Sequence, residues 1–221
     1  PAEAILDIDI STLDLADTVS WDTTVAAKNL RVTVNSGIGN DKVTAAAPTE
    51  ARIFTEAGED EVGGSNAEDD IRTGSENDTI DAGLGNDSLN PGPGSDRVIA
   101  GPGSDRISDS QVADPGDVYN GGPGLGDSLE SRQRENPMKI SLDGAANDGE
   151  AGENDNLISM ERVDSGLGAD VLTGGDVDAG TLVSEEYLHA LERKHFCNLL
   201  DNPKTQERIM GMLSTGKPLR N

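Results

Sequence analysis

The stretch TGSENDTIDAGLGNDSLNPGPGSDRVIAGPGSDRIS, residues 73–108, repeats one pattern four times with a period of nine. Each copy has a glycine at its second place, an aspartate at its sixth and a single apolar residue at its eighth. The glycines are Gly74, Gly83, Gly92 and Gly101, the aspartates are Asp78, Asp87, Asp96 and Asp105, and the apolar residues are Ile80, Leu89, Val98 and Ile107. A fixed short period is the sequence signature of a solenoid, in which each repeat stacks on its neighbours.

Each repeat divides into a turn and a short strand. The glycine at the second place, and a further glycine at the fourth in Gly85, Gly94 and Gly103, allow a tight turn with positive φ. A strand of about three residues with one inward side chain can form a core only by stacking on other strands. The pattern therefore predicts an all-β fold, a parallel β-roll (right-handed β-solenoid) with Ile, Leu and Val piled in columns.

The apolar column extends beyond the four clear repeats. Upstream it includes Ile71, Val62 and Ile53 and, after a slip of one residue, Val43, Val34 and Val25; downstream it includes Val118, Leu129, Val163 and Leu172. Apolar residues also alternate with small or acidic ones over residues 5–15, which predicts strands at the start of the same stack. The solenoid is thus expected to be longer than its four regular repeats.

The aspartates predict a metal. If two repeats form one coil, residues eighteen apart lie one above another at the spacing of parallel strands, roughly 4.8 Å. Asp78 then faces Asp96, and Asp87 faces Asp105, so their charges repel unless a cation lies between them. Calcium accepts six to eight oxygens in loose geometry, whereas magnesium requires a tighter octahedron. No Cys or His stands near the repeats to favour zinc.

The candidate calcium ligands are carboxylates and glycine-turn carbonyls. The aspartates are Asp41, Asp60, Asp69, Asp78, Asp87, Asp96, Asp105, Asp127 and Asp170; the glycines are Gly74, Gly83, Gly85, Gly92, Gly94, Gly101 and Gly103. The alternative for each aspartate is a turn cap whose side chain bonds its own loop. A helix-loop-helix calcium loop from Asp143 is rejected, because the glycine required at its sixth position is Asp148.

Composition supports a cation as partner. The formal net charge is −25, and the negative excess lies in residues 1–183, because residues 184–221 carry six Lys or Arg and five Asp or Glu. Such a charge argues against nucleic acid as a partner. No apolar run is long enough to span a membrane, and no signal peptide is visible. Acidic chains with only 2 % aromatic residues are often disordered, but disorder does not keep a register of nine.

The repeats AGLGNDSLN, PGPGSDRVI, AGPGSDRIS and NGGPGLGDSLE (residues 120–130) resemble the nonapeptide G-G-x-G-x-D-x-apolar-x of the repeats-in-toxin family of hemolysin-type calcium-binding proteins. The resemblance covers roughly residues 36–130 and 156–175, with the first glycine replaced by Ala, Pro or Thr. It implies a β-roll that folds on meeting external Ca²⁺, as a module of a secreted or cell-surface bacterial protein. An extracellular or cell-surface location is therefore expected.

Five segments are expected from these patterns. They are a metal-poor start of the solenoid over 1–35, calcium-binding repeats over 36–130, an acidic insert over 131–157, resumed repeats over 158–183, and a helical hairpin over 184–221. The last segment resembles the helical C-terminus of crotonase-type enoyl-CoA hydratases, whose catalytic residues lie upstream of it. It is expected to cap the roll or to dock a partner.

No catalysis is expected. The chain contains no H-E-x-x-H, G-x-S-x-G or P-loop motif. His195 and Cys197 lie two residues apart, so on a helix they would point in different directions. The leading hypothesis is a structural module that binds calcium. The alternatives are an adhesin or surface-layer element that binds a glycan or protein partner, and a non-catalytic fragment of a larger secreted enzyme.

Overall fold

The computed structural model describes residues 6–12, 14–22, 30–46, 49–114 and 116–173. Val25 and the helical hairpin expected over 184–221 lie outside the described residues. Within the described ranges the chain forms strands and turns, without a helix. No helix among them is long and apolar enough to cross a membrane.

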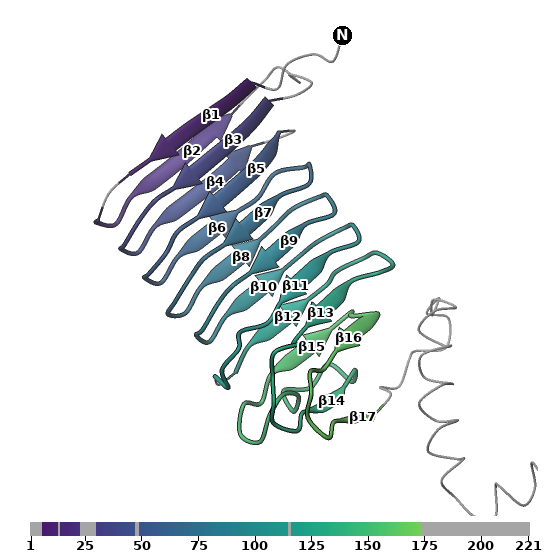
Figure 1. Ribbon diagram of the computed structural model, residues 1–221. Coiled ribbons are helices and arrows are strands. Elements are labelled where there is room, and N and C mark those ends of the chain that lie inside the picture. The colour runs from purple at the N-terminus through teal and green to yellow at the C-terminus, as the bar shows by residue number, and fades with distance from the viewer. Residues whose placement is uncertain (1–5, 13, 23–29, 47–48, 115, 174–221) are drawn as a thin grey trace, which may run out of the picture. The chain divides into compact units, whose positions relative to one another are not determined.

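Two parallel sheets are formed by alternate strands, as the labels in Figure 1 show. The odd sheet consists of β1 (Leu6–Ser11), β3 (Leu30–Asn35), β5 (Glu50–Phe54), β7 (Asp70–Arg72), β9 (Ser88–Asn90), β11 (Arg106–Ser108), β13 (Ser128–Glu130) and β16 (Arg162–Asp164). The even sheet consists of β2 (Thr18–Asp22), β4 (Lys42–Ala46), β6 (Glu61–Gly63), β8 (Thr79–Asp81), β10 (Arg97–Ile99), β12 (Val118–Asn120) and β15 (Asn156–Ile158). A separate two-stranded sheet pairs β14 (Lys139–Ser141) with β17 (Val171–Thr173).

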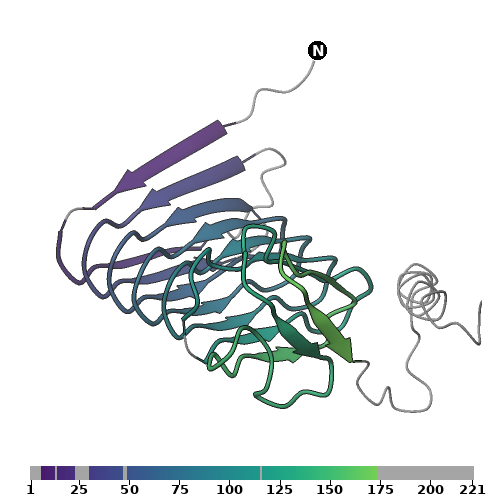
Figure 2. The ribbon, with the colours of Figure 1, turned by 60° about the horizontal axis from the view of Figure 1, so that its bottom comes forward.

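One coil of the solenoid contains two repeats. Ile80 of β8 lies beside Val98 of β10, and Ile71 of β7 lies beside Leu89 of β9, in each case eighteen residues further along the chain. Figure 2 shows the coils stacked one behind another. The predicted parallel β-solenoid is therefore confirmed for the described residues.

The core is a stack of single side chains from the middle of each strand. The buried members of the column are Val19, Val32, Val34, Val43, Ile53, Val62, Ile71, Ile80, Leu89, Val98, Ile107, Tyr119, Leu129 and Leu157. Burying one such aliphatic side chain contributes about 1.5–3 kcal/mol. This is less than the cost of ordering the nine residues of a repeat, about 1–2 kcal/mol each for the backbone, so no coil is stable without its neighbours.

The predicted apolar column is wrong at Val118. Tyr119, not Val118, points inward, since Tyr119 is 1 % exposed and lies between Val98 and Leu157 in the even sheet. The segment between β11 and β12 is longer than a regular repeat, so the spacing no longer fixes which residue faces the core. Leu172 also leaves the column, because β17 pairs with β14 and not with the two long sheets.

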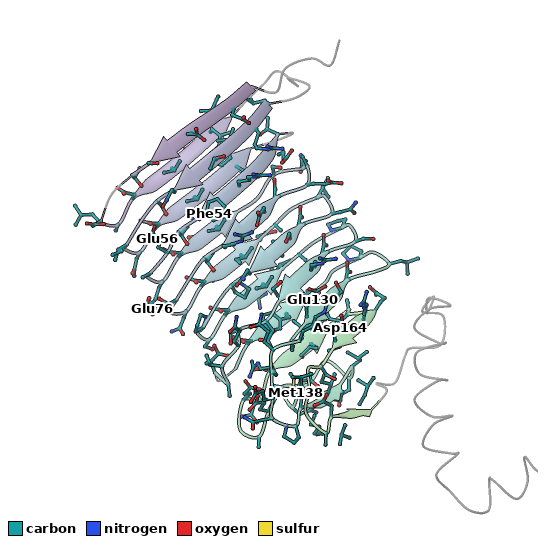
Figure 3. All side chains as sticks on the ribbon, viewed as in Figure 1. Phe54, Glu56, Glu76, Glu130, Met138 and Asp164 are labelled. Atoms are coloured by element: carbon teal, nitrogen blue, oxygen red, sulfur yellow. The ribbon has the colours of Figure 1, made fainter. Side chains whose placement is uncertain are left out.

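The repeat glycines are required for two different reasons. At Gly83 φ is +98°, and a Cβ would lie 2.1 Å from the carbonyl oxygen of Ser65 in the preceding coil. Gly103 does not have positive φ, contrary to the sequence prediction, but its Cβ would lie 1.6 Å from the carbonyl oxygen of Gly85. Close stacking of turns, as well as backbone conformation, therefore selects glycine. Glu56 and Glu76 occupy two glycine places with φ of 74° and 79°, along one edge of the roll (Figure 3).

Candidate metal centre

Buried aspartates form two columns along the roll, each at the turns that lead into the strands of one sheet. The even-sheet column consists of Asp17, Asp41, Asp60, Asp78, Asp96, Asp117 and Asp155; the odd-sheet column consists of Asp69, Asp87, Asp105 and Asp127. Ten of these eleven side chains are buried and Asp17 is half-buried. The structure thus brings together most of the predicted site residues, and brings them together by column.

One carboxylate oxygen of each aspartate ties neighbouring coils together. The backbone N–H of Asp60 donates to Oδ1 of Asp78, and that of Asp78 donates to Oδ1 of Asp96, both at 2.8 Å. The same bond joins Asp87 to Asp105 at 2.8 Å. Because these partners are eighteen residues apart, the side chains cap the coil before them and not their own loops.

The second carboxylate oxygen has no partner in most of the column. Among the described residues, Oδ2 is buried and without a hydrogen bond in Asp17, Asp41, Asp60, Asp78, Asp87, Asp96, Asp105 and Asp127. A buried polar atom without a partner is costly, and an ionised one more so. Eight such atoms at equivalent places in successive coils are the arrangement expected of a protein that binds cations.

Backbone carbonyls lie near the repeat aspartates. At Gly94, a Cβ would lie 1.9 Å from the carbonyl oxygen of Glu76 in the preceding coil and 3.0 Å from Oδ1 of Asp96, the oxygen that accepts the N–H of Asp78. At Gly85, it would lie 2.3 Å from the carbonyl oxygen of Ala67 and 2.6 Å from Oδ1 of Asp87. The missing side chains therefore leave carbonyl and carboxylate oxygens close together, and such oxygens are the ligands that calcium prefers.

Asp69 and Asp170 differ from the other candidates. Both oxygens of Asp69 are bonded: Oδ1 accepts from the N–H of Ala51 at 2.7 Å, and Oδ2 accepts from the N–H of Ser65 at 2.6 Å. Asp170 accepts from the N–H of Met138 at 3.0 Å and from the hydroxyl of Ser165 at 2.7 Å. These two side chains have the bonding of turn caps, the alternative that the sequence left open.

Burial makes the aspartates hard to ionise when no cation is present. Desolvation raises the pKa of Asp78 and of Asp87 to about 7 and that of Asp96 to about 8, against an ordinary 3.8. Neighbouring carboxylates add to the rise, and the backbone N–H bonds oppose it. The column therefore favours either bound protons or bound cations over free carboxylates.

Sequence reasoning missed Asp17, Asp117, Asp155 and Glu161. Asp117 accepts from the N–H of Asp96 at 2.8 Å, and Glu161 accepts from the N–H of Asp127 at 2.9 Å. The available signal was the triplet of an acidic residue, any residue and an apolar one, which occurs as Asp117-Val118-Tyr119, Asp155-Asn156-Leu157 and Glu161-Arg162-Val163. Spacing hid it, since these partners are 21 to 38 residues apart.

Carboxylates alone do not complete a metal site. No group of three or more His, Cys, Asp or Glu side chains in the described part of the chain could hold a metal ion. The aspartates of each column stack one per coil, so backbone carbonyls must supply most of the remaining ligands. This donor set suits calcium and excludes the His and Cys sites of zinc.

Comparison with known proteins identifies the repeats. Residues 63–98 and 91–110 match a protein family described as RTX calcium-binding nonapeptide repeat (4 copies). The chain therefore contains RTX-type calcium-binding repeats. The ion of its RTX repeats is calcium, and the role of the roll is structural.

A segment of 51 residues is 51 % identical to a probable 3-hydroxyacyl-CoA dehydrogenase of Bacillus subtilis (strain 168). It represents 23 % of this RTX chain and 6 % of that relative, so no activity is carried over from it. The resemblance predicted for residues 184–221 stays a prediction. No solved structure matches the RTX chain.

Proposed function

We propose that calcium ions are held between successive coils by the free Oδ2 atoms of the two aspartate columns and by carbonyls of the glycine turns. The observation that carries this proposal is the set of eight buried Oδ2 atoms without a hydrogen bond. The ligands are taken from Asp17, Asp41, Asp60, Asp78, Asp87, Asp96, Asp105 and Asp127, with carbonyls from turns that include Gly74, Gly83, Gly85, Gly92, Gly94, Gly101 and Gly103. Asp69 and Asp170 stay outside the set because both of their oxygens are bonded.

Calcium binding folds the roll. Without cations the carboxylates of adjacent coils repel one another, and a chain of net charge −25 expands. An ion that binds the folded coils and not the unfolded chain adds its binding free energy to the stability of the fold. Extracellular calcium modules bind with dissociation constants of roughly 10⁻⁴–10⁻³ M. Binding is cooperative, because each turn lies between the coil before it and the coil after it.

The module works outside the cell. RTX repeat proteins are generally secreted or extracellular, and external calcium reaches the concentration that such sites require. The chain carries no chemistry of its own and serves as a structural element of a larger secreted or surface protein.

The experiment that tests this function is equilibrium dialysis with calcium, followed by the same measurement with magnesium. We expect several calcium ions per chain at millimolar concentration and far weaker binding of magnesium. The substitution Asp87→Asn should lower the number bound, whereas Asp70→Asn, which removes a carboxylate from the outer face of β7, should not. Equal binding of the two metals, or equal loss in both variants, would contradict the proposed sites.

A further inference from the structure

The side chain of Arg134 is completely enclosed, with none of it exposed. It comes from the turn after β13. Nε lies 2.9 Å from the carbonyl oxygen of Ser110 and 3.2 Å from Oδ2 of Asp109, and it donates to both. Nη2 donates to Oδ1 of Asp109 at 3.1 Å, and Nη1 donates to Glu153. A buried arginine of this kind is stable only when it has hydrogen-bond acceptors, and here each of its three nitrogens donates to one.

Two further carboxylates lie close to the same guanidinium. Oε1 of Glu150 is 3.5 Å from Nη1, and Oδ1 of Asp114 is 3.7 Å from Nη2. The other oxygen of Asp114 accepts from the N–H of Gly94, a glycine of the repeat turn before Asp96, at 2.9 Å. One positive charge therefore faces four carboxylates, and one of these reaches back to the last regular repeat of the even-sheet column.

Tyr119 connects Arg134 to the aspartate column itself. The tyrosine hydroxyl donates to Oδ2 of Asp117 at 2.7 Å and lies 3.3 Å from Oδ1 of Asp109, the carboxylate that Arg134 binds. Asp117 is thus the first aspartate in its column whose Oδ2 has a donor within the protein.

The free carboxylate oxygens end where Arg134 enters. In the even-sheet column every aspartate from Asp17 to Asp96 has an unpaired Oδ2, and Asp117 does not. In the odd-sheet column, which Arg134 does not contact, Asp127 in the next coil still has an unpaired Oδ2. Within the even-sheet column the change coincides with Tyr119, whose hydroxyl donates to Asp117 and lies beside the Asp109 carboxylate that Arg134 binds.

A guanidinium and a calcium ion satisfy carboxylates under different conditions. Calcium is present only when the solution supplies it, whereas arginine is protonated at every physiological pH and offers five fixed donors. Arg134 therefore supplies one permanent positive charge to Asp109, Asp114, Glu150 and Glu153, whatever the calcium concentration.

We propose that Arg134 is a built-in cation that takes the place of calcium at the C-terminal end of the even-sheet column. The coils around Tyr119, Leu129 and Leu157, where Asp127 is the one described aspartate with an unpaired Oδ2, then stay ordered in calcium-free solution, while the coils from Asp41 to Asp105 do not. The inference rests on the proposed function, because it divides the roll into a part that requires calcium and a part that does not.

Hydrogen–deuterium exchange of the full chain, resolved by peptide and measured with calcium and with a chelator, tests the role of Arg134 and the proposed calcium-dependent folding. In chelator we expect peptides from residues 116–130 and 156–164 to exchange at least tenfold more slowly than an unfolded reference. Peptides from residues 60–105 should exchange at the unfolded rate. In Arg134→Met the new side chain is of similar length but carries no charge. Peptides from residues 116–130 and 156–164 should then lose their protection in chelator.

Arg132→Met is the matched control. Arg132 lies two residues away, its side chain is 57 % exposed, and it pairs with Asp164 on the surface, so its loss should leave the protection unchanged. Complete exchange of residues 116–130 in the wild-type chain in chelator would overturn the inference without any variant. So would protection that survives in Arg134→Met or is lost equally in Arg132→Met. Protection of residues 60–105 in chelator would instead overturn the proposed function.

Discussion

The substitution Asp96→Asn separates a calcium ligand from a simple turn cap. Asparagine keeps an oxygen that can accept the N–H of Asp78, so the bond between coils is retained. It removes the negative charge and places an amide N–H₂ where the unpaired Oδ2 lay. We therefore expect opposite effects in the two states: the calcium-free fold becomes more stable, and the calcium-bound fold becomes less stable.

The size of the first effect follows from the pKa of Asp96, which burial raises from 3.8 to about 8. Keeping this group ionised would cost about 6 kcal/mol at about 1.4 kcal/mol per pH unit, and screening by nearby solvent reduces the figure to about 1–3 kcal/mol. The loss of a charged ligand in calcium is of similar size, about 1–3 kcal/mol, which corresponds to roughly 5- to 150-fold in affinity.

Circular dichroism at pH 8 measures both effects. In chelator the β signal of the variant should exceed that of the wild-type chain. In millimolar calcium the melting temperature should fall, by about 2–4 °C for each 1 kcal/mol lost in a chain of this length. The control is Asp81→Asn, which removes an equal charge from the exposed end of β8 and should change neither. Shifts of the same sign in both solutions would refute the argument that Asp96 binds a cation.

Further predictions concern the turns, the core and pH. Asp69→Asn should lower the melting temperature in calcium, because both of its oxygens bond to protein, and it should not change the number of ions bound in dialysis. Gly83→Ala should prevent the calcium-induced β signal in circular dichroism, since its Cβ would lie 2.1 Å from the carbonyl oxygen of Ser65. Leu89→Ala, at a site 1 % exposed, should cost about 2–5 kcal/mol in urea unfolding with calcium. In chelator, acid should restore structure: the pKa of Asp78 is raised from 3.8 to about 7, so the stability gained by protonation is complete below about pH 4 and is lost as pH rises through about 7. A β signal in chelator that is stronger at pH 8 than at pH 5 would contradict this sign.

Much of the fold could be predicted because one repeat contains all the information that one half-coil needs. The nine-residue period sets the length of the half-coil, and the eighteen-residue coil then follows from pairing, as the register of Ile80 with Val98 confirms. The aspartates precede the strands of both sheets for the same reason. Where the nine-residue period is intact, the place of a residue in its repeat determines its place in the coil.

The prediction failed where the coil length changes. Between Ile107 and Tyr119 the chain has extra residues, and Val118 was taken as the inward residue because it is aliphatic. Tyr119 could fill that place because its hydroxyl finds Asp117 inside the protein. The inward residue of β12 thus depends on a hydrogen bond to Asp117, which directly precedes the strand. The spacing of the repeats carries no information about this bond.

The surroundings of Arg134 could not be predicted from the sequence either. Its four carboxylate partners lie 16 to 25 residues upstream or downstream, and no motif joins them. Each is an acidic residue in a chain that has 42, so nothing in the sequence marks these four as partners of one arginine. Only the stacking of turns of unequal length brings them together.

The central claim is that cations between the coils hold the roll together, and far-UV circular dichroism during a calcium titration tests it most directly. Starting in chelator at pH 8, the account predicts that most of the chain lacks β-structure and that the β signal rises cooperatively in the submillimolar to millimolar range. Magnesium at the same concentrations should leave the spectrum unchanged. A full β signal in excess chelator at pH 8, unaltered by calcium, would contradict the account.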